Sequence, residues 1–434
     1  MSFTQSLNAK YFDNGLSKEV IDLLAPLDNE RDEVHRFLDR MGRNMHRHGL
    51  GAHNFSELSA WFIAEFVPKL LPGAWNNAVP PITLKGRHEL LDQYLTGNNW
   101  YRVGKGDSML DLGCGFPPET TMDTAGAHPD LQILGADPSF GKYLVKDSDS
   151  HYACFDENCE LLYFQASSFD IDAWEAVFAD PAATKARFLD HLQSAKDQLD
   201  AFGEGFVSID KDGINLQQNP VLQYAKNNLS FTQQGIGSEF NQSFNVIRCM
   251  NVLIYFDRDF RHKAFEWAAE SLQDGGLMIT GMDWAGTRSA RIAINQCIDG
   301  ELKPREVAIS IDNLRPLDIA PWFTLVEEDY ETVAMVEIAH LLRSDRSFVV
   351  DFDRRMDELL GEHNLCARKE NGFLGSIAPD SPPDAIDRVS GEIIRTIVSD
   401  GFVDQAVESL NRQGIEAKRN CIDFIAVNPD SLSN

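Results

Sequence analysis

The spacing of apolar side chains changes near residue 86 of the chain. Over residues 1–85, apolar positions such as Leu58, Trp61 and Phe62 recur at helical spacing, which predicts amphipathic helices. From residue 86 onward, helical patterns alternate with short apolar runs, namely SMLDLG, QILGAD, FNVIRCM and GGLMITGMD. Strands that alternate with helices favour a parallel, doubly wound sheet. We therefore expect an α/β protein with an N-terminal helical domain over residues 1–85.

A long interval over residues 141–243 separates the run QILGAD from the run FNVIRCM. It contains helical patterns and a predicted ribbon around CELLYFQ, so we interpret it as an insertion in a core domain over residues 86–290. Insertions in this architecture usually shape substrate access. Residues 291–434 are predicted to form a C-terminal helical region that ends in a strand, CIDFIAVNPD. The pattern leaves open whether this region completes the sheet or forms a separate cap.

The charge of the chain narrows the choice of partners. With 39 basic and 67 acidic residues, the formal net charge is -28, which disfavours nucleic acid and anionic membranes as partners. No apolar run approaches the roughly 20 residues that span a bilayer, and the N-terminal stretch MSFTQSLNAKYFDNG lacks a signal-peptide pattern. Seven scattered cysteines suggest a reducing compartment. We expect a cytoplasmic protein without a metal site. A homo-oligomer is compatible with the sequence, but no feature indicates one.

A pair of glycines follows the first predicted strand, in the stretch LDLGCGFPPETT. Gly113 and Gly115 lie where that strand turns toward a helix, and a backbone without Cβ atoms lets a ligand approach closely. The third glycine of a dinucleotide fingerprint is missing, which disfavours a pyrophosphate ligand. Asp137 ends the next strand, where a carboxylate can accept hydrogen bonds from both hydroxyls of a ribose. Together these features predict a nucleoside-bearing cofactor.

The same residues carry a resemblance to a known family. LDLGCG and GADPS resemble the first two motifs of the class I S-adenosylmethionine-dependent methyltransferases. The segment FNVIRCMNVLIYFDRDFRHKAFEWAAESLQDGGLMITGMDW is similar to a segment of the chemotaxis-receptor glutamate methyltransferases of the CheR type. The resemblance covers roughly residues 105–285 without the insertion. It implies a Rossmann-like class I methyltransferase sheet and S-adenosyl-L-methionine as the cofactor.

The resemblance also implies roles for single residues. Asn251 and Tyr255 match the Asn and Tyr of the family's Asn-Val-Leu-Ile-Tyr segment and are the candidate catalytic residues. From the residues alone, Asn251 can also be interpreted as the N-cap of the following helix, and Tyr255 as a half-buried aromatic side chain. The implied cofactor contacts are Asp111, Gly113, Cys114, Gly115, Glu119, Asp137, Gln234, Ile236 and Asn251.

A second group of residues indicates the acceptor side. Trp284 follows the strand GGLMITGMD, and Arg288 and Arg291 share one face if their segment is helical. Two arginines there can clamp a carboxylate or another anion of a small substrate, although a solvated helix face has the same pattern. Where the family has an arginine before its asparagine, this chain has Met250, with Arg248 two residues earlier. That departure and the insertion disfavour receptor glutamate as the acceptor.

Several functions remain compatible with these motifs. The leading hypothesis is an S-adenosylmethionine-dependent methyltransferase that acts on a small-molecule acceptor. The same cofactor can instead be attacked at another carbon of its sulfonium, in a cyclisation or an aminocarboxypropyl transfer that releases methylthioadenosine. Protein glutamate methylation and cofactor binding without catalysis are two further candidate functions.

Overall fold

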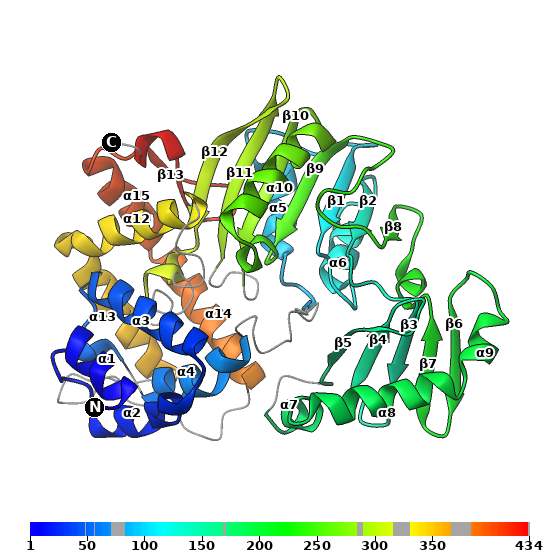
Figure 1. Cartoon of the computed structure of the whole chain (residues 1–434). Helices are drawn as coiled ribbons and strands as arrows, with labels where there is room; N and C mark the ends of the chain where they lie inside the picture. Colours follow the sequence, from blue (N-terminus) through cyan, green and yellow to red (C-terminus); the bar gives the residue numbers. More distant parts are fainter. Residues whose placement is uncertain are drawn as a thin grey trace.

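The computed structural model describes residues 1–47, 49–55, 57–70, 83–167, 171–283, 290–315, 330–365 and 383–432. A nine-stranded sheet forms its centre, with the strand order β13-β14-β12-β11-β10-β9-β1-β2-β8 (Figure 1). Five of these strands pair in parallel, and their bounds are β1 Ser108–Leu112, β2 Gln132–Ala136, β8 Leu229–Thr232, β9 Phe244–Met250 and β10 Leu272–Met282.

The order of the parallel strands defines a doubly wound sheet. The five parallel strands lie side by side in the order β8, β2, β1, β9, β10. If they are renumbered 1 to 5 by their order in the chain, this arrangement reads 3-2-1-4-5. The strand order therefore reverses between β1 and β9, and ligands of such sheets bind beyond the carboxyl ends of the strands at that reversal. The α/β fold with a doubly wound, Rossmann-like sheet is confirmed. β8 lies within the interval 141–243 of the sequence but belongs to this sheet.

Antiparallel strands extend the sheet beyond β10. They are β11 Arg291–Ile298, β12 Glu301–Ile309, β14 Ile425–Val427 and the edge strand β13 Ala417–Arg419. Residues after 290 therefore complete the sheet, a choice that the sequence left open. Arg291 begins β11 and does not lie on a helix, because the β-branched Ile292 and Ile294 that follow it fill the sheet's core.

Helices cover both faces of the parallel strands. α5 Glu89–Gly97 and α6 Glu119–Ala127 lie on one face, where Leu91, Tyr94 and Ala125 pack with Met109 and Val246. α10 Arg258–Ser271 covers the other face, where its alanines at 264 and 268 pack against β1, β9 and β10. The side chain of Asp257 caps α10 by accepting a hydrogen bond from the Phe260 N–H at 2.9 Å.

The insertion forms a second sheet of its own. Its five strands are all antiparallel in the order β5-β4-β3-β7-β6. The strand bounds are β3 Tyr143–Lys146, β4 Tyr152–Phe155, β5 Leu161–Gln165, β6 Val207–Lys211 and β7 Ile214–Gln218. The helices are α7 Ile171–Phe178, α8 Pro181–Gln193 and α9 Lys196–Asp200. Phe188 and Leu192 of α8 pack on the sheet, and the 3-10 turn Pro220–Tyr224 leads the chain back to β8.

The helices from the two ends of the sequence share one apolar core (Figure 1). Leu38 and Ile63 from the first part of the chain belong to the same cluster as Ile338 and Val403 from the last part. None of the described helices is long and apolar enough to cross a bilayer. The bounds are α1 Phe3–Tyr11, α2 Lys18–Leu24, α3 Asp32–Arg47, α4 Glu57–Leu70, α12 Tyr330–Ser344, α13 Arg346–Glu362, α14 Pro383–Ser399 and α15 Phe402–Arg412, with short 3-10 turns at Ala25–Asn29, Ala52–Asn54, Ile311–Leu314 and Pro429–Leu432.

Candidate active site

The glycine turn after β1 lies at the reversal of strand order. Gly113 and Gly115 have φ angles of 65° and 70°, in the left-handed region that favours glycine. A Cβ atom at Gly113 would lie 2.3 Å from Cγ2 of Val252, so a larger residue does not fit there. The Gly113 N–H donates to the Ala136 carbonyl at 2.8 Å, which fixes the turn to the end of β2. The two glycines thus bring bare backbone to the edge where a ligand would bind.

Asp137 joins this turn from the end of β2. Its Oδ2 accepts a hydrogen bond from the Gly115 N–H at 2.9 Å, and its Oδ1 accepts one from the Ser139 N–H at 2.8 Å. Burial raises the pKa of Asp137, and the hydrogen bonds from Ser139 and Gly115 offset only part of that rise. Oδ1 also accepts a hydrogen bond from the Ser139 hydroxyl at 2.5 Å. Asp137 can therefore accept one ribose hydroxyl on the free lone pair of Oδ2, and a second one on Oδ1 where it replaces the Ser139 hydroxyl. The residues present fit a nucleoside cofactor.

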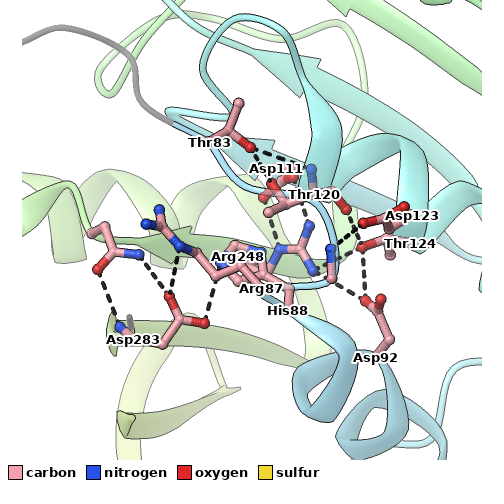
Figure 2. A network of polar contacts seen from close by, with 12 residues as sticks. Thr83, Arg87, His88, Asp92, Asp111, Thr120, Asp123, Thr124, Arg248 and Asp283 are labelled. Atoms are coloured by element: carbon pink, nitrogen blue, oxygen red, sulfur yellow. Dashed lines mark hydrogen bonds and ion pairs between the residues drawn. The ribbon is translucent and has the colours of Figure 1, made fainter. Parts of the chain in front are cut away.

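A buried ion pair lies beneath the turn. Asp111 of β1 and Arg248 of β9 are register partners, and the guanidinium donates from Nε to Oδ1 at 2.8 Å and from Nη2 to Oδ2 at 2.7 Å. Nη1 of Arg248 donates to Asp92 of α5 at 3.2 Å and to Thr124 of α6 at 2.9 Å (Figure 2). Burial alone would raise the pKa of Asp111, but the Arg248 guanidinium outweighs it and the pKa is lowered. This network fixes α5 and α6 to the sheet, and a cofactor contact by Asp111 stays a prediction.

Asn251 ties the ends of β9 and β10 together. Its N–H donates to the Gly281 carbonyl at 2.9 Å, and its side-chain amide donates to Asp283 Oδ1 at 2.7 Å. The Asp283 N–H donates back to Asn251 Oδ1 at 3.1 Å. Asn251 has a φ of 59°, and the N-cap of α10 is Asp257, so the interpretation of Asn251 as a helix cap is wrong.

Tyr255 ends the short 3-10 turn Leu253–Tyr255 that follows β9. Its side chain keeps contact with solvent, with 37% of its surface exposed. Burial nevertheless raises the pKa of its hydroxyl, and the positive charge of Arg87 opposes that rise.

Arg87 and His88 lie at Asp283 and were missed in the sequence. Nε of Arg87 lies 3.9 Å from Asp283 Oδ1, and Nε2 of His88 lies 3.6 Å from Asp283 Oδ2. Figure 2 shows both side chains between Asp283 and the Arg248 network. The Gly86 N–H donates to Asp123 of α6 at 2.6 Å, which holds this segment in place. The only local signal was a pair of basic residues just before a predicted helix.

The other predicted cofactor residues lie within the turn, at the start of α6 and after β8. Glu119 is half-buried at the start of α6. The Gln234 amide donates to the Glu239 carbonyl at 3.1 Å, and Ile236 packs beside the apolar cluster under α10. Cys114 lies buried among apolar side chains of the insertion, and burial raises the pKa of its thiol. These four positions remain predicted cofactor contacts.

The predicted arginine clamp is only partly within the described residues. Trp284 and Arg288 lie outside them. Arg291 is buried in β11, and its Nη2 lies 2.8 Å from the Met282 sulfur. Met250, which stands at the family's arginine position, is buried in the apolar cluster under α5. A role of Arg291 toward a substrate therefore stays a prediction.

The sheet and the site define a class of protein. The 3-2-1-4-5 strand order, the glycine turn and the carboxylate after β2 are arranged as the resemblance to class I S-adenosylmethionine-dependent methyltransferases implies. The chain is 27% identical over 103 residues to a chemotaxis protein methyltransferase of Listeria monocytogenes serovar 1/2a. The match covers 24% of this chain and 38% of that relative, so it spans under two fifths of the relative's length. No family model matches the chain.

Three solved structures were also found to be similar. The PKMT2 protein of Rickettsia typhi in complex with AdoHcy gives a TM-score of 0.20 at 14% identity, over 48% of this chain and 25% of that one. A second PKMT2 structure gives a TM-score of 0.22 at 10% identity, over 78% and 44% of the two chains. An O-methyltransferase family 2 protein of Planctomyces limnophilus in complex with apigenin gives a TM-score of 0.23 at 11% identity, over 64% of this chain and 74% of that one. Because these scores are low, the fold assignment rests on the sheet order.

Proposed function

We propose that this chain is an S-adenosylmethionine-dependent methyltransferase that acts on a small-molecule acceptor. The observation that carries the proposal is the hydrogen bond between the Gly115 N–H and Asp137. It joins a glycine turn and a buried carboxylate at the reversal of strand order, where this fold binds its ligands. The similarity to a chemotaxis protein methyltransferase supports methyl transfer as the reaction, but it does not bear on the small-molecule acceptor.

The residues divide the binding of the cofactor among them. Asp137 would accept the ribose hydroxyls, the turn from Gly113 to Gly115 would pass beneath the methionine part, and Gln234 with Ile236 would flank the adenine. When bound, the cofactor supplies an electrophilic methyl group on its sulfonium. The protein's task is then to hold the acceptor in line with that group, because orientation accounts for most of the rate of such a displacement.

The surroundings of the turn support a small acceptor. The Tyr152 hydroxyl of the insertion donates to the Phe116 carbonyl at 3.0 Å, and Phe116 packs with apolar side chains of the second sheet. The insertion therefore covers one side of the glycine turn. His88 and Asp283, on the other side, are 6% and 5% exposed. A compact molecule can reach such groups more easily than the surface of a folded protein can.

The proposal is tested by separating the products formed from S-adenosylmethionine. Purified protein is incubated with the cofactor alone and with a panel of phenols, alcohols and amines. Formation of S-adenosylhomocysteine that depends on an acceptor supports methyl transfer. Methylthioadenosine released without an acceptor would instead favour cyclisation or aminocarboxypropyl transfer. Absence of cofactor binding by calorimetry would overturn the assignment, and binding that is lost in Asp137→Ala would support the placement of the ribose.

A further inference from the structure

The imidazole of His88 is buried without a hydrogen-bond partner. Only 6% of His88 is exposed, and within the described part of the chain neither ring nitrogen makes a hydrogen bond. His88 is the N-cap residue of α5, yet its side chain does not cap the helix. Burying polar atoms without partners costs free energy, so an unpaired imidazole beside a ligand site indicates that a ligand supplies the missing partner.

Charged groups from several elements face this imidazole. Asp283, which follows β10, is the nearest, with Oδ2 at 3.6 Å from Nε2. Asp92 of α5 and Asp111 of β1 also interact with His88 electrostatically, and both carboxylates bind Arg248 of β9. The Arg87 guanidinium also lies at Asp283, with Nε 3.9 Å from Oδ1. Among the described residues, carboxylates from three different parts of the fold therefore lie around the imidazole.

Asp283 also orients the ring. A carboxylate beside Nε2 favours the tautomer with its proton on that nitrogen, which leaves Nδ1 as the basic atom. Asp283 is itself held by two hydrogen bonds with Asn251, at 2.7 Å and 3.1 Å. The candidate base therefore has a positioned partner, and this partner is fixed at the carboxyl ends of the two strands beside the reversal of strand order.

We infer that His88 is the general base of the proposed methyl transfer, and that the acceptor is a nucleophile that arrives with its proton, a hydroxyl or an amine. The inference rests on the proposed function and deepens it. A carboxylate acceptor arrives ionised and needs no base. It would also be repelled by the buried Asp283. Asp283 and Asn251 act through His88 and are positioning residues.

The chemical step conserves atoms and charge. The acceptor's O–H or N–H bond breaks and its proton moves to Nδ1 of His88. The electron pair of the nucleophile forms the new bond to the methyl carbon, while the bond from that carbon to sulfur breaks and its electrons remain on sulfur. The sulfonium becomes the neutral thioether, and the imidazolium, stabilised by Asp283, returns its proton to solvent.

A crystal structure with S-adenosylhomocysteine tests this role without a known acceptor. A nucleophile lies roughly 3 Å from the methyl carbon and about 3 Å from its base. A ring nitrogen of His88 should therefore lie within about 8 Å of the cofactor sulfur and should stay free of contact with the cofactor. A greater distance, or a hydrogen bond from His88 to the cofactor's adenine, ribose or carboxylate, would overturn the inference.

Calorimetry of a variant provides the second measurement. His88→Gln should change the Kd of S-adenosylhomocysteine by less than about threefold, because a base for the acceptor does not hold the cofactor. A Kd roughly tenfold weaker would make His88 a cofactor ligand and overturn the inference. The control is His151→Gln, since His151 is equally buried but accepts a hydrogen bond from the Ser167 N–H in the insertion. If the unmodified protein does not bind the cofactor at all, the proposed function fails as well.

Discussion

Replacing Arg248 by methionine should destabilise the sheet severely. The guanidinium makes four hydrogen bonds at 2.7 to 3.2 Å to Asp111, Asp92 and Thr124, and both carboxylates are buried. Methionine fills a similar volume but leaves these two carboxylates without their cation. Removing one partner of a buried ion pair costs about 3–5 kcal/mol, against a total stability of roughly 5–15 kcal/mol for a folded domain.

Hydrogen exchange measured by mass spectrometry gives the local free energy directly. A loss of about 3–5 kcal/mol corresponds to exchange that is roughly 150- to 5,000-fold faster in peptides from β1 and β9. Arg354→Met is the matched control, because Arg354 pairs with Asp351 and Glu358 on α13 with 59% of its side chain exposed. Exposed pairs contribute about 0–1 kcal/mol. If both variants fall within about 1 kcal/mol of the unmodified protein, the buried network does not hold the sheet and the reasoning is refuted.

Three further predictions concern the same edge of the sheet. Gly113→Ala should lower stability by about 2–5 kcal/mol, because its Cβ would be strained by the left-handed backbone and would clash with Val252. A melting temperature like that of the unmodified protein would contradict this prediction. Asp137→Asn should weaken S-adenosylhomocysteine binding roughly 10- to 150-fold by calorimetry. Asp137→Asn should leave the midpoint of urea unfolding unchanged or higher, because burial raises the pKa of Asp137 and disfavours its charged form in the folded state. A lower midpoint would contradict this expectation. Asp111 has a lower pKa in the folded state than its unfolded-state pKa of about 3.9, so its ionised form stabilises the fold at any pH above that value. This stabilisation is lost as the pH falls from there through the folded-state pKa. Acid titration of the unfolding free energy should show this loss in the unmodified protein and not in Arg248→Met.

The parallel sheet was predictable because its signals are local. The run FNVIRCM is buried at every position of β9, and a short apolar run between turn signals is typical of such a strand. The contact between Gly115 and Asp137 follows from topology, since the carboxyl ends of neighbouring parallel strands meet at one edge. The proximity of the glycine turn and its carboxylate could therefore be predicted from the sequence.

The buried Arg248 network and the residues around Asp283 could not be found in this way. The bond from Arg248 to Asp92 joins positions 156 residues apart, and a buried ion pair leaves no local pattern in the sequence. Arg87 and His88 precede a helix and look like ordinary surface residues until the fold brings them to Asp283. The strand that begins at Arg291 was hidden because spaced arginines suggested a helix face, whereas the β-branched residues that follow determine the structure.

The shared core of the two sets of helices has a consequence for synthesis of the chain. From residue 70 at the end of α4 to residue 330 at the start of α12 there are 260 positions. At about 5–20 residues per second, a ribosome needs roughly 13–50 s to cover them. During that time α1 to α4 leave the ribosome without the helices that bury their apolar faces, while both sheets are still being made. Aggregation during production should therefore begin at these early helices, and the yield of intact protein should rise when chaperones cover them.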